Sequence, residues 1–203
     1  MLTAFGEIKL ILQPKQYFPQ QKELVHKIVE LASNGFGFQM GYDDVLGHLT
    51  APQKVLLGYV SSAPVIMYAH SHLNLKGRQV MYVDGVVVRK DFQTKGMFPA
   101  MTRMIAENAE YIGLRTQNPA MQRALEKYCK TTHPGHNDSD EEIKQVQQNL
   151  AKHLGMNIDE NGLQKGFYPI RLSYNKILQN HVFTKIGVMQ ENCDAVLVVG
   201  KCT

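Results

Sequence analysis

The stretch VDGVVVRKDFQTKGMF, from Val83 to Phe98, carries the strongest indication of the fold. Its first half is apolar and β-branched, as in a buried strand, and a charged turn then leads to Gly96, just before a run with helical spacing. The N-terminus of such a helix offers unpaired backbone N–H groups and the positive end of the helix dipole, which favour a phosphate. Gln93 and Lys95 add a donor and a charge. A plain strand-to-helix turn is the more common structure at such a junction. The choice between a phosphate site and a plain turn therefore depends on the neighbouring elements.

The sequence before this stretch predicts helices followed by a meander of strands. An alternating apolar pattern at 5–12 indicates a strand, and apolar positions at helical spacing over 20–34 indicate a helix. Asp43 and Asp44 open a short second helix. Three strand-like runs with hairpin-length connections then predict three antiparallel strands. These runs span residues 54–60, 64–73 and 78–88.

The sequence after the stretch continues with helix, strand and helix. Helical spacing runs from Met97 to Tyr111, and the strand-like run 112–117 precedes a helix that Asn118 can cap and Pro119 can open. The complete order β-α-α-β-β-β-α-β-α predicts an α+β fold, with a mixed, mostly antiparallel central sheet flanked by helices.

The C-terminal third is predicted to add an insertion and two strands. Residues 131–165 are polar and rich in turn formers, and Ser139 and Glu142 have the spacing of a capping box for a helix at 143–154. We interpret 131–165 as a helical insertion into a single domain that spans 1–203. Two further strands are expected at residues 181–189 and 194–200. The last of them, as an edge strand, would allow a homodimer.

The sequence QTKGMF resembles the pyrophosphate loop of the GNAT superfamily, the acetyl-coenzyme A dependent N-acetyltransferases. That loop reads Gln or Arg, two residues of any type, Gly, one residue of any type, and Gly or Ala. It follows a strand and a short charged turn, as Arg89–Phe92 follows Val86–Val88 here. LRTQNPAMQRALEKY resembles the family's next strand and its Asn-opened helix. The resemblance covers residues 5–129 and the final strand, and it implies a GNAT-like domain with the opening stretch as a pyrophosphate site.

The resemblance also implies which residues contact acetyl-CoA. The contacts fall on the end of a strand, on the loop and on the start of a later helix; they are Val86, Val87, Val88, Gln93, Thr94, Lys95, Gly96, Met97, Phe98 and Asn118. Two positions depart from the family. Phe98 replaces the second small residue of the loop, although its side chain can turn into the core. Leu125 stands where many members carry a tyrosine that acts as general acid.

Acetyl transfer needs a base or a water relay for the amine and a proton for the leaving thiolate, and the sequence offers three catalytic candidates. Asp84 lies in the strand before the loop; a solvent-facing turn residue is the alternative interpretation. Tyr128 is the nearest phenol, almost one turn beyond the family's position. His70 alternates with Tyr68 and His72 on one strand face, which is either part of a substrate cleft or an exposed polar face.

Composition and charge argue against several other functions. Lys and Arg exceed Asp and Glu by 22 to 18, a surplus too small and too scattered for a nucleic-acid binder. The N-terminus is predicted to be a strand and not a signal peptide, and no apolar run approaches the roughly 20 residues of a membrane helix. The three cysteines lack CxxC spacing, and His70 with His72 lacks a third ligand. We therefore expect a cytoplasmic protein with neither a disulfide framework nor a metal site.

The sequence thus predicts an acyltransferase that moves an acetyl group from acetyl-CoA to an amine by direct transfer, with the identity of the amine left open. The alternative is a non-catalytic module of the same fold that binds coenzyme A or a protein partner. Phe98, Leu125 and the lack of an unambiguous base favour that alternative.

Overall fold

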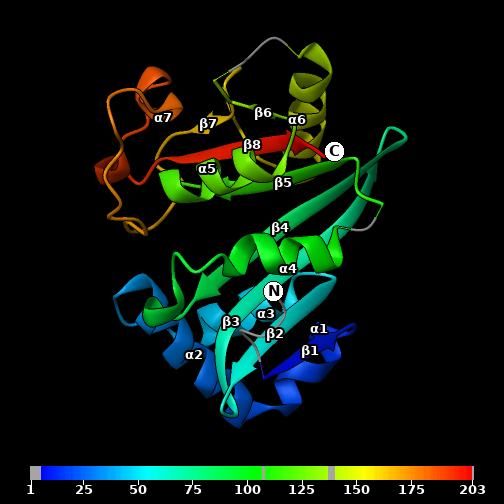
Figure 1. Ribbon diagram of the computed structural model, residues 1–203, viewed down its shortest axis with the longest axis vertical. Coiled ribbons are helices and arrows are strands. Elements are labelled where there is room, and N and C mark those ends of the chain that lie inside the picture. The colour runs from blue at the N-terminus through cyan, green and yellow to red at the C-terminus, as the bar shows by residue number, and fades with distance from the viewer. Residues whose placement is uncertain (1–5, 107, 137–139, 203) are drawn as a thin grey trace. The chain divides into compact units, whose positions relative to one another are not determined.

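The computed structural model describes residues 6–106, 108–136 and 140–202 (Figure 1). The chain divides into two compact units. The first unit holds the chain up to His72 together with the stretch that starts at Val83 and includes the helix after it. The second unit holds Leu73–Tyr82 and the chain from Asn108 onward. The long strands β3 (Ala63–Leu75) and β4 (Arg78–Val88) contribute residues to both units.

The first unit carries the predicted meander. Its strands lie in the order β1-β2-β3-β4, and β2 (Lys54–Val60) pairs antiparallel with both β1 (Glu7–Ile11) and β3. The helical elements of this unit are α1 (Pro14–Tyr17), the 3-10 turn η2 (Phe18–Gln20), α2 (Lys22–Phe36), α3 (Tyr42–Thr50), the 3-10 turn η3 (Lys90–Phe92) and α4 (Met97–Ile105).

One face of this meander is closed by α2 and α3. Apolar residues recur at helical spacing along both helices, and alternate residues of β2 and β3 point toward them. The buried core of this face includes Val25, Ile28 and Leu31 of α2, Val45 and Leu49 of α3, and Val55, Leu57, Met67 and Ala69 of the strands. Residues of the opposite parity face α4, where the hydroxyl groups of Tyr68 and Thr102 are hydrogen-bonded at 3.0 Å.

The second unit is built around β8 (Ala195–Lys201), the red strand in Figure 1. It pairs antiparallel with β5 (Tyr111–Thr116) on one side and with β6 (Thr131–His133) and β7 (Leu163–Gln164) on the other. The helical elements are α5 (Pro119–Tyr128), α6 (Glu141–His153), α7 (Val182–Lys185) and the 3-10 turn η4 (Gln190–Asn192). The apolar stripe of α6 packs on Tyr111, Leu197 and Val199 of the strands.

The predicted α+β class is confirmed, with a mostly antiparallel sheet flanked by helices. The predicted strand at 181–189 is wrong, because α7 occupies that place. The side chain of His181 caps the first turn of α7, with Nδ1 accepting a 3.1 Å hydrogen bond from the Phe183 N–H, and Gly187 leaves the turn at φ +74°.

The predicted strand at 194–200 is confirmed as β8, but its predicted position at the edge of the sheet is wrong. Within the described residues β8 has strands on both sides, so it offers no free edge to a second copy of the chain. Residues 131–165 supply β6, α6 and β7, and their origin as an insertion stays a prediction. The helix begins at Glu141 with Asp140 as its cap, whereas Ser139 lies outside the described residues. No described helix is long and apolar enough to cross a bilayer.

Candidate functional site

The segment after β4 makes a tight connection into α4. β4 ends at Val88, η3 covers Lys90–Phe92 and α4 begins at Met97. Thr94 and Gly96 adopt φ values of +64° and +75°, which turn the chain into the helix. Gly96 is the N-cap residue, and no atom lies within 4 Å of the place where its Cβ would sit. A glycine here avoids left-handed strain and leaves the first N–H groups of the helix without a side-chain cap.

This connection is fixed to the end of α2. The Gln93 Nε2 group donates to the backbone oxygens of Gly35 at 2.9 Å and Val88 at 3.0 Å, and the Lys90 N–H donates to Asn34 Oδ1 at 2.8 Å. A Cβ on Gly35 would lie 2.7 Å from the Val88 oxygen, so only a glycine lets α2 approach the end of β4 this closely. The Gln93 amide therefore holds the loop in place.

Cationic side chains gather on the aromatic ring of Phe92. The Arg89 guanidinium lies 4.7 Å from the ring centroid and the Lys95 ammonium 5.1 Å, on the same loop. Arg89 also makes a bidentate ion pair with Asp91, in which Nε donates to Oδ1 at 2.8 Å and Nη2 donates to Oδ2 at 3.0 Å. This hydrogen-bonded pairing with Arg89 lowers the pKa of Asp91. The loop thus carries ordered positive charge beside the N-terminus of α4.

The Phe98 side chain lies in the core and not over the loop. Its ring is 6% exposed and stacks on Tyr68, with centroids 5.7 Å apart and planes at 16°. Thr102 ties the same region together, because its hydroxyl donates to the Phe98 carbonyl at 2.8 Å and contacts the Tyr68 hydroxyl. The ring at this position therefore packs inward and leaves the start of α4 unobstructed.

His70 is a buried imidazole without a hydrogen-bond partner. It is 1% exposed, and neither Nδ1 nor Nε2 has a hydrogen-bond partner among the residues that the structure describes. Burial, with smaller contributions from His72 and Lys54, lowers the pKa of His70 to about 4, so the ring is neutral at pH 7. Tyr68, on the same strand face, is also fully buried. The alternative of an exposed polar face is therefore wrong for these two residues.

Asp84 is held at a fixed place in β4. Its Oδ2 accepts a 2.8 Å hydrogen bond from the Ser71 hydroxyl, and Ser71 Oγ in turn accepts one from the Gln53 N–H at 3.2 Å. Asp84 is half-buried, so it is neither a core residue nor a freely solvated turn residue. The hydrogen bond from Ser71 holds the Asp84 carboxylate in a fixed orientation, as is suitable for a group that accepts a proton.

In the second unit, Asn118 is the N-cap residue of α5. Its Oδ1 accepts two hydrogen bonds of 2.9 Å, one from the Ala120 N–H and one from Asn175 Nδ2. Both partners are donors, so they identify the oxygen and fix the amide orientation. The other end of the amide, Nδ2, is therefore the donor of this side chain.

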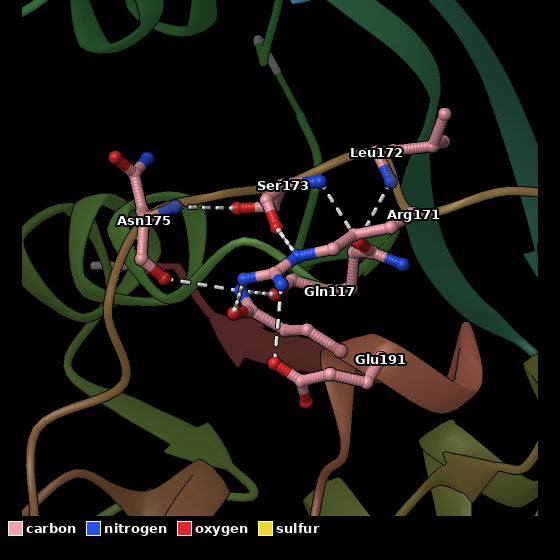
Figure 2. A network of polar contacts seen from close by, with 7 residues as sticks. Gln117, Arg171, Leu172, Ser173, Asn175 and Glu191 are labelled. Atoms are coloured by element: carbon pink, nitrogen blue, oxygen red, sulfur yellow. Dashed lines mark hydrogen bonds and ion pairs between the residues drawn. The ribbon is translucent and has the colours of Figure 1, made fainter.

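A buried polar network holds the segment around Asn175 against the start of α5 (Figure 2). The Gln117 side chain is 2% exposed, and its Oε1 accepts 2.8 Å hydrogen bonds from the N–H groups of Leu172 and Ser173. Gln190 Nε2 donates to the backbone oxygens of Gln117 and Asn175, at 3.0 and 3.1 Å. The backbone N–H and C=O groups of this irregular segment thus find hydrogen-bond partners in the side chains of Gln117 and Gln190.

Arg171 completes this network. Its guanidinium donates to the Ser173 carbonyl at 2.8 Å, to Gln190 Oε1 at 3.2 Å and to Glu191 Oε1 at 3.1 Å. These side chains were missed in the sequence, because a lone Gln or Arg carries no signal of a partner so far along the chain. The only hint was that Gln117 comes just before the Asn118 cap.

The candidate general acid is displaced from the family's position. Leu125 is fully buried, and a Cβ on Gly200 would lie 3.2 Å from its Cγ, so this position faces the strand core. Tyr128 is half-buried at the last position of α5. The Leu125 side chain has no proton to donate, so this position cannot supply a general acid.

The predicted site residues fall in both units. His70, Asp84, Val86–Val88 and Gln93–Phe98 belong to the first unit, and Asn118 and Tyr128 belong to the second. Within the first unit the structure brings His70 and Phe98 together at the ring of Tyr68. Among the described residues, no three His, Cys, Asp or Glu side chains are grouped so as to hold a metal ion.

No protein-family model matches the sequence, and a search of curated proteins finds no match either. Several solved structures are similar in fold. One is the ribosomal-protein-S18-alanine N-acetyltransferase from Escherichia coli, with 9% identity and a TM-score of 0.48 over 97% of this chain and 95% of that chain. Another is the IAA acetyltransferase from Bacillus cereus, with 12% identity and a TM-score of 0.46 over 96% and 99%.

A third similar structure is a GNAT-like decarboxylase in complex with isobutyryl-CoA, with 11% identity and a TM-score of 0.46 over 97% of this chain and 99% of that chain. Two of these three structures are thus described as acetyltransferases and the third as a GNAT-like decarboxylase. At these identities and TM-scores, the comparison transfers no activity, ligand or acceptor to this chain.

Proposed function

We propose that this protein is a GNAT-like acyltransferase that binds acetyl-CoA and transfers the acetyl group directly to an amine. The observation that carries the proposal is the geometry at Gly96. A glycine with φ +75° caps α4 directly after the strand and loop that resemble the family's motif, and the ring of Phe98 is turned into the core. Uncapped N–H groups, the helix dipole and the cations on Phe92 suit the pyrophosphate of a coenzyme.

In this proposal the loop from Gln93 to Phe98 binds the pyrophosphate through its backbone, with Lys95 adding charge. Val86–Val88 offer backbone groups to the pantetheine arm and the thioester carbonyl, and Asn118 donates from Nδ2 to a carbonyl of that arm. Two of these groups have an orientation fixed within their own unit: the Val88 carbonyl accepts from the Gln93 amide, and the Asn118 amide accepts from Ala120 and Asn175. Preorganised donors of this kind stabilise charge as it develops on an oxygen.

The transfer itself joins the amine nitrogen to the thioester carbon and breaks the carbon–sulfur bond. The amine loses a proton and the sulfur leaves as a thiolate, which then takes a proton. His70 and Asp84 are the proposed groups on the amine side. A buried imidazole without a partner is costly, and an amine N–H or a relaying water would satisfy it. Tyr128 is the proposed donor to the sulfur.

Release of free coenzyme A thiol, measured on a panel of small amines, peptide N-termini and lysine peptides, tests this proposal. We expect release with at least one acceptor class, and a strong decrease in kcat for Asp84→Ala or His70→Ala with little change in acetyl-CoA binding. Turnover that is indifferent to both substitutions would remove these residues from the mechanism.

A second candidate function is a non-catalytic module that binds coenzyme A. The buried Leu125 favours it, because the family's acid position points into the core here. This candidate predicts stabilisation by coenzyme A and acetyl-CoA alike, without thiol release on any member of the amine panel.

A further inference from the structure

Cys129 and Cys202 come together at one end of the second unit. Cys129 follows α5 directly and precedes β6, and Cys202 follows β8 directly. β6 and β8 are antiparallel neighbours in which Thr131 pairs with Lys201. The two cysteines therefore approach the same corner of the sheet from adjacent strands, although they are far apart in the sequence.

The side chains also share one face of β8. Gly200 and Cys202 are two residues apart along an extended chain, so their Cα–Cβ directions point to the same side. A Cβ on Gly200 would overlap the sulfur of Cys129, so Cys129 Sγ occupies the space above Gly200 on that face. The two thiols are close enough there for each to shift the pKa of the other.

The backbone fixes both residues in this arrangement. The Lys130 N–H donates to the Lys201 oxygen at 3.0 Å, and the Cys202 N–H donates to the Glu110 oxygen at 2.8 Å. Cys129 is 7% exposed, whereas Cys202 is partly exposed. One thiol is thus open to a reagent and the other is sheltered behind it.

We propose that Cys129 and Cys202 form a reversible intramolecular disulfide, which makes this corner a site of oxidative modification. The inference is independent of the proposed acetyl transfer. Cys202 is the thiol that reacts first and Cys129 is the one that resolves the intermediate. The third cysteine, Cys193, takes no part.

The chemistry balances with a disulfide such as oxidised glutathione as the oxidant. The Cys202 thiolate attacks one sulfur of glutathione disulfide; that bond breaks, one glutathione leaves as a thiolate, and Cys202 is joined to the other. The Cys129 thiol then loses its proton to solvent and attacks the Cys202 sulfur, which forms the Cys129–Cys202 bond and releases the second glutathione. Two electrons pass from the protein to the oxidant.

The electrostatics of the pair support this order of reaction. The interaction with the Cys129 thiol lowers the pKa of Cys202, and the same interaction together with burial raises the pKa of Cys129. A lowered pKa increases the fraction of nucleophilic thiolate at Cys202.

Alkylation after oxidation tests the proposal on the full chain. The native, reduced protein is incubated with glutathione disulfide, quenched with acid, unfolded and treated with N-ethylmaleimide, and its intact mass is measured. We expect alkylated thiols to fall from three to one in the wild type, and Cys193→Ser to fall from two to none. Cys129→Ala should instead retain one glutathione on Cys202.

The wild-type measurement needs no substitution and therefore does not depend on the folding of any variant. Three alkylated thiols after oxidation, or glutathione found on Cys193 alone, would overturn the proposal. Loss of two thiols that persists in Cys202→Ser would overturn it as well, because the bond would then join a different pair.

Discussion

Asn175 Nδ2 donates a 2.9 Å hydrogen bond to Oδ1 of Asn118, across 57 residues of sequence. Asn118 opens α5, and the second donor to the same oxygen is the Ala120 N–H of that helix. An irregular segment of the chain thus helps to fix which end of the Asn118 amide accepts and which end donates. This relationship links the polar network of Figure 2 to the donor that we assign to coenzyme binding.

We predict that Asn175→Ala weakens acetyl-CoA binding without abolishing turnover. One hydrogen bond at an exposed site contributes about 1 kcal/mol or less, which corresponds to roughly a threefold to fivefold rise in KM for acetyl-CoA. Steady-state kinetics should show kcat almost unchanged. Asn157→Ala, an exposed asparagine of the same unit, is the matched control and should leave both constants unchanged. An equal loss in kcat with KM unaffected would contradict the positioning role.

Gln117→Ala should destabilise the protein. The substitution leaves the N–H groups of Leu172 and Ser173 without the acceptor they share, and a buried unpaired group costs about 1–3 kcal/mol. For a chain of this length we expect a fall in Tm of roughly 2–12 °C by differential scanning calorimetry. Limited trypsin digestion should cleave after Arg171 sooner. The exposed Gln145→Ala is the control, and a Tm that falls equally in both variants would argue against the network.

Two glycines within helices should respond to alanine with opposite signs. A Cβ on Gly35 would lie 2.5 Å from Val87 Cγ2, so Gly35→Ala should force α2 away from β4 and cost about 1–3 kcal/mol. Gly47 lies inside α3 with open space around it, and Gly47→Ala should stabilise the protein by about 0.5–1 kcal/mol. Urea denaturation measures both. A Gly35→Ala variant as stable as the wild type would mean that α2 does not pack this closely.

His70 predicts a stability that decreases in acid. Burial lowers the pKa of His70 to about 4, below its ordinary value of 6.5. Between pH 4 and pH 6.5, His70 is therefore protonated in the unfolded chain and neutral in the folded chain. Stability is therefore full above pH 6.5 and falls as the pH drops toward 4, by about 3 kcal/mol from this group. His72 and Lys54 also face His70 and lower its pKa. The variants His72→Gln and Lys54→Met therefore measure how much each of these charges contributes to the pH dependence.

His70→Leu should flatten this dependence when the free energy of unfolding is measured from pH 7 to pH 4. The exposed His48→Gln is the control and should keep the wild-type slope. A slope that is the same in wild type and His70→Leu would show that His70 is not buried in the neutral form.

Much of the fold was accessible from the sequence because its patterns are local. Alternation along β2 and β3, helical spacing in α2, and the Asn118-Pro119 cap of α5 each report the structure of their own segment. The strand predicted at 181–189 failed for the same reason. Its apolar residues fit a strand, but the cap by His181 and the turn at Gly187 select a short helix.

The candidate site was only partly accessible for the opposite reason. Gly96 and the inward turn of Phe98 could be anticipated, since a glycine before a helix and a large apolar residue have strong preferences of their own. The burial of Tyr68 depends on its contacts with α4. The hydrogen bonds of Gln117 and Asn175 join segments that are far apart in the sequence. Likewise, no sequence pattern indicated that β8 would have strands on both sides.

Calorimetric titration with acetyl-CoA tests the central claim most directly. We predict saturable one-to-one binding, and binding at least about tenfold weaker for acetyl-pantetheine, which lacks the pyrophosphate that the Gly96 loop is proposed to hold. Absence of binding at millimolar acetyl-CoA, or equal affinity for the two compounds, would contradict the assignment of this loop as a pyrophosphate site.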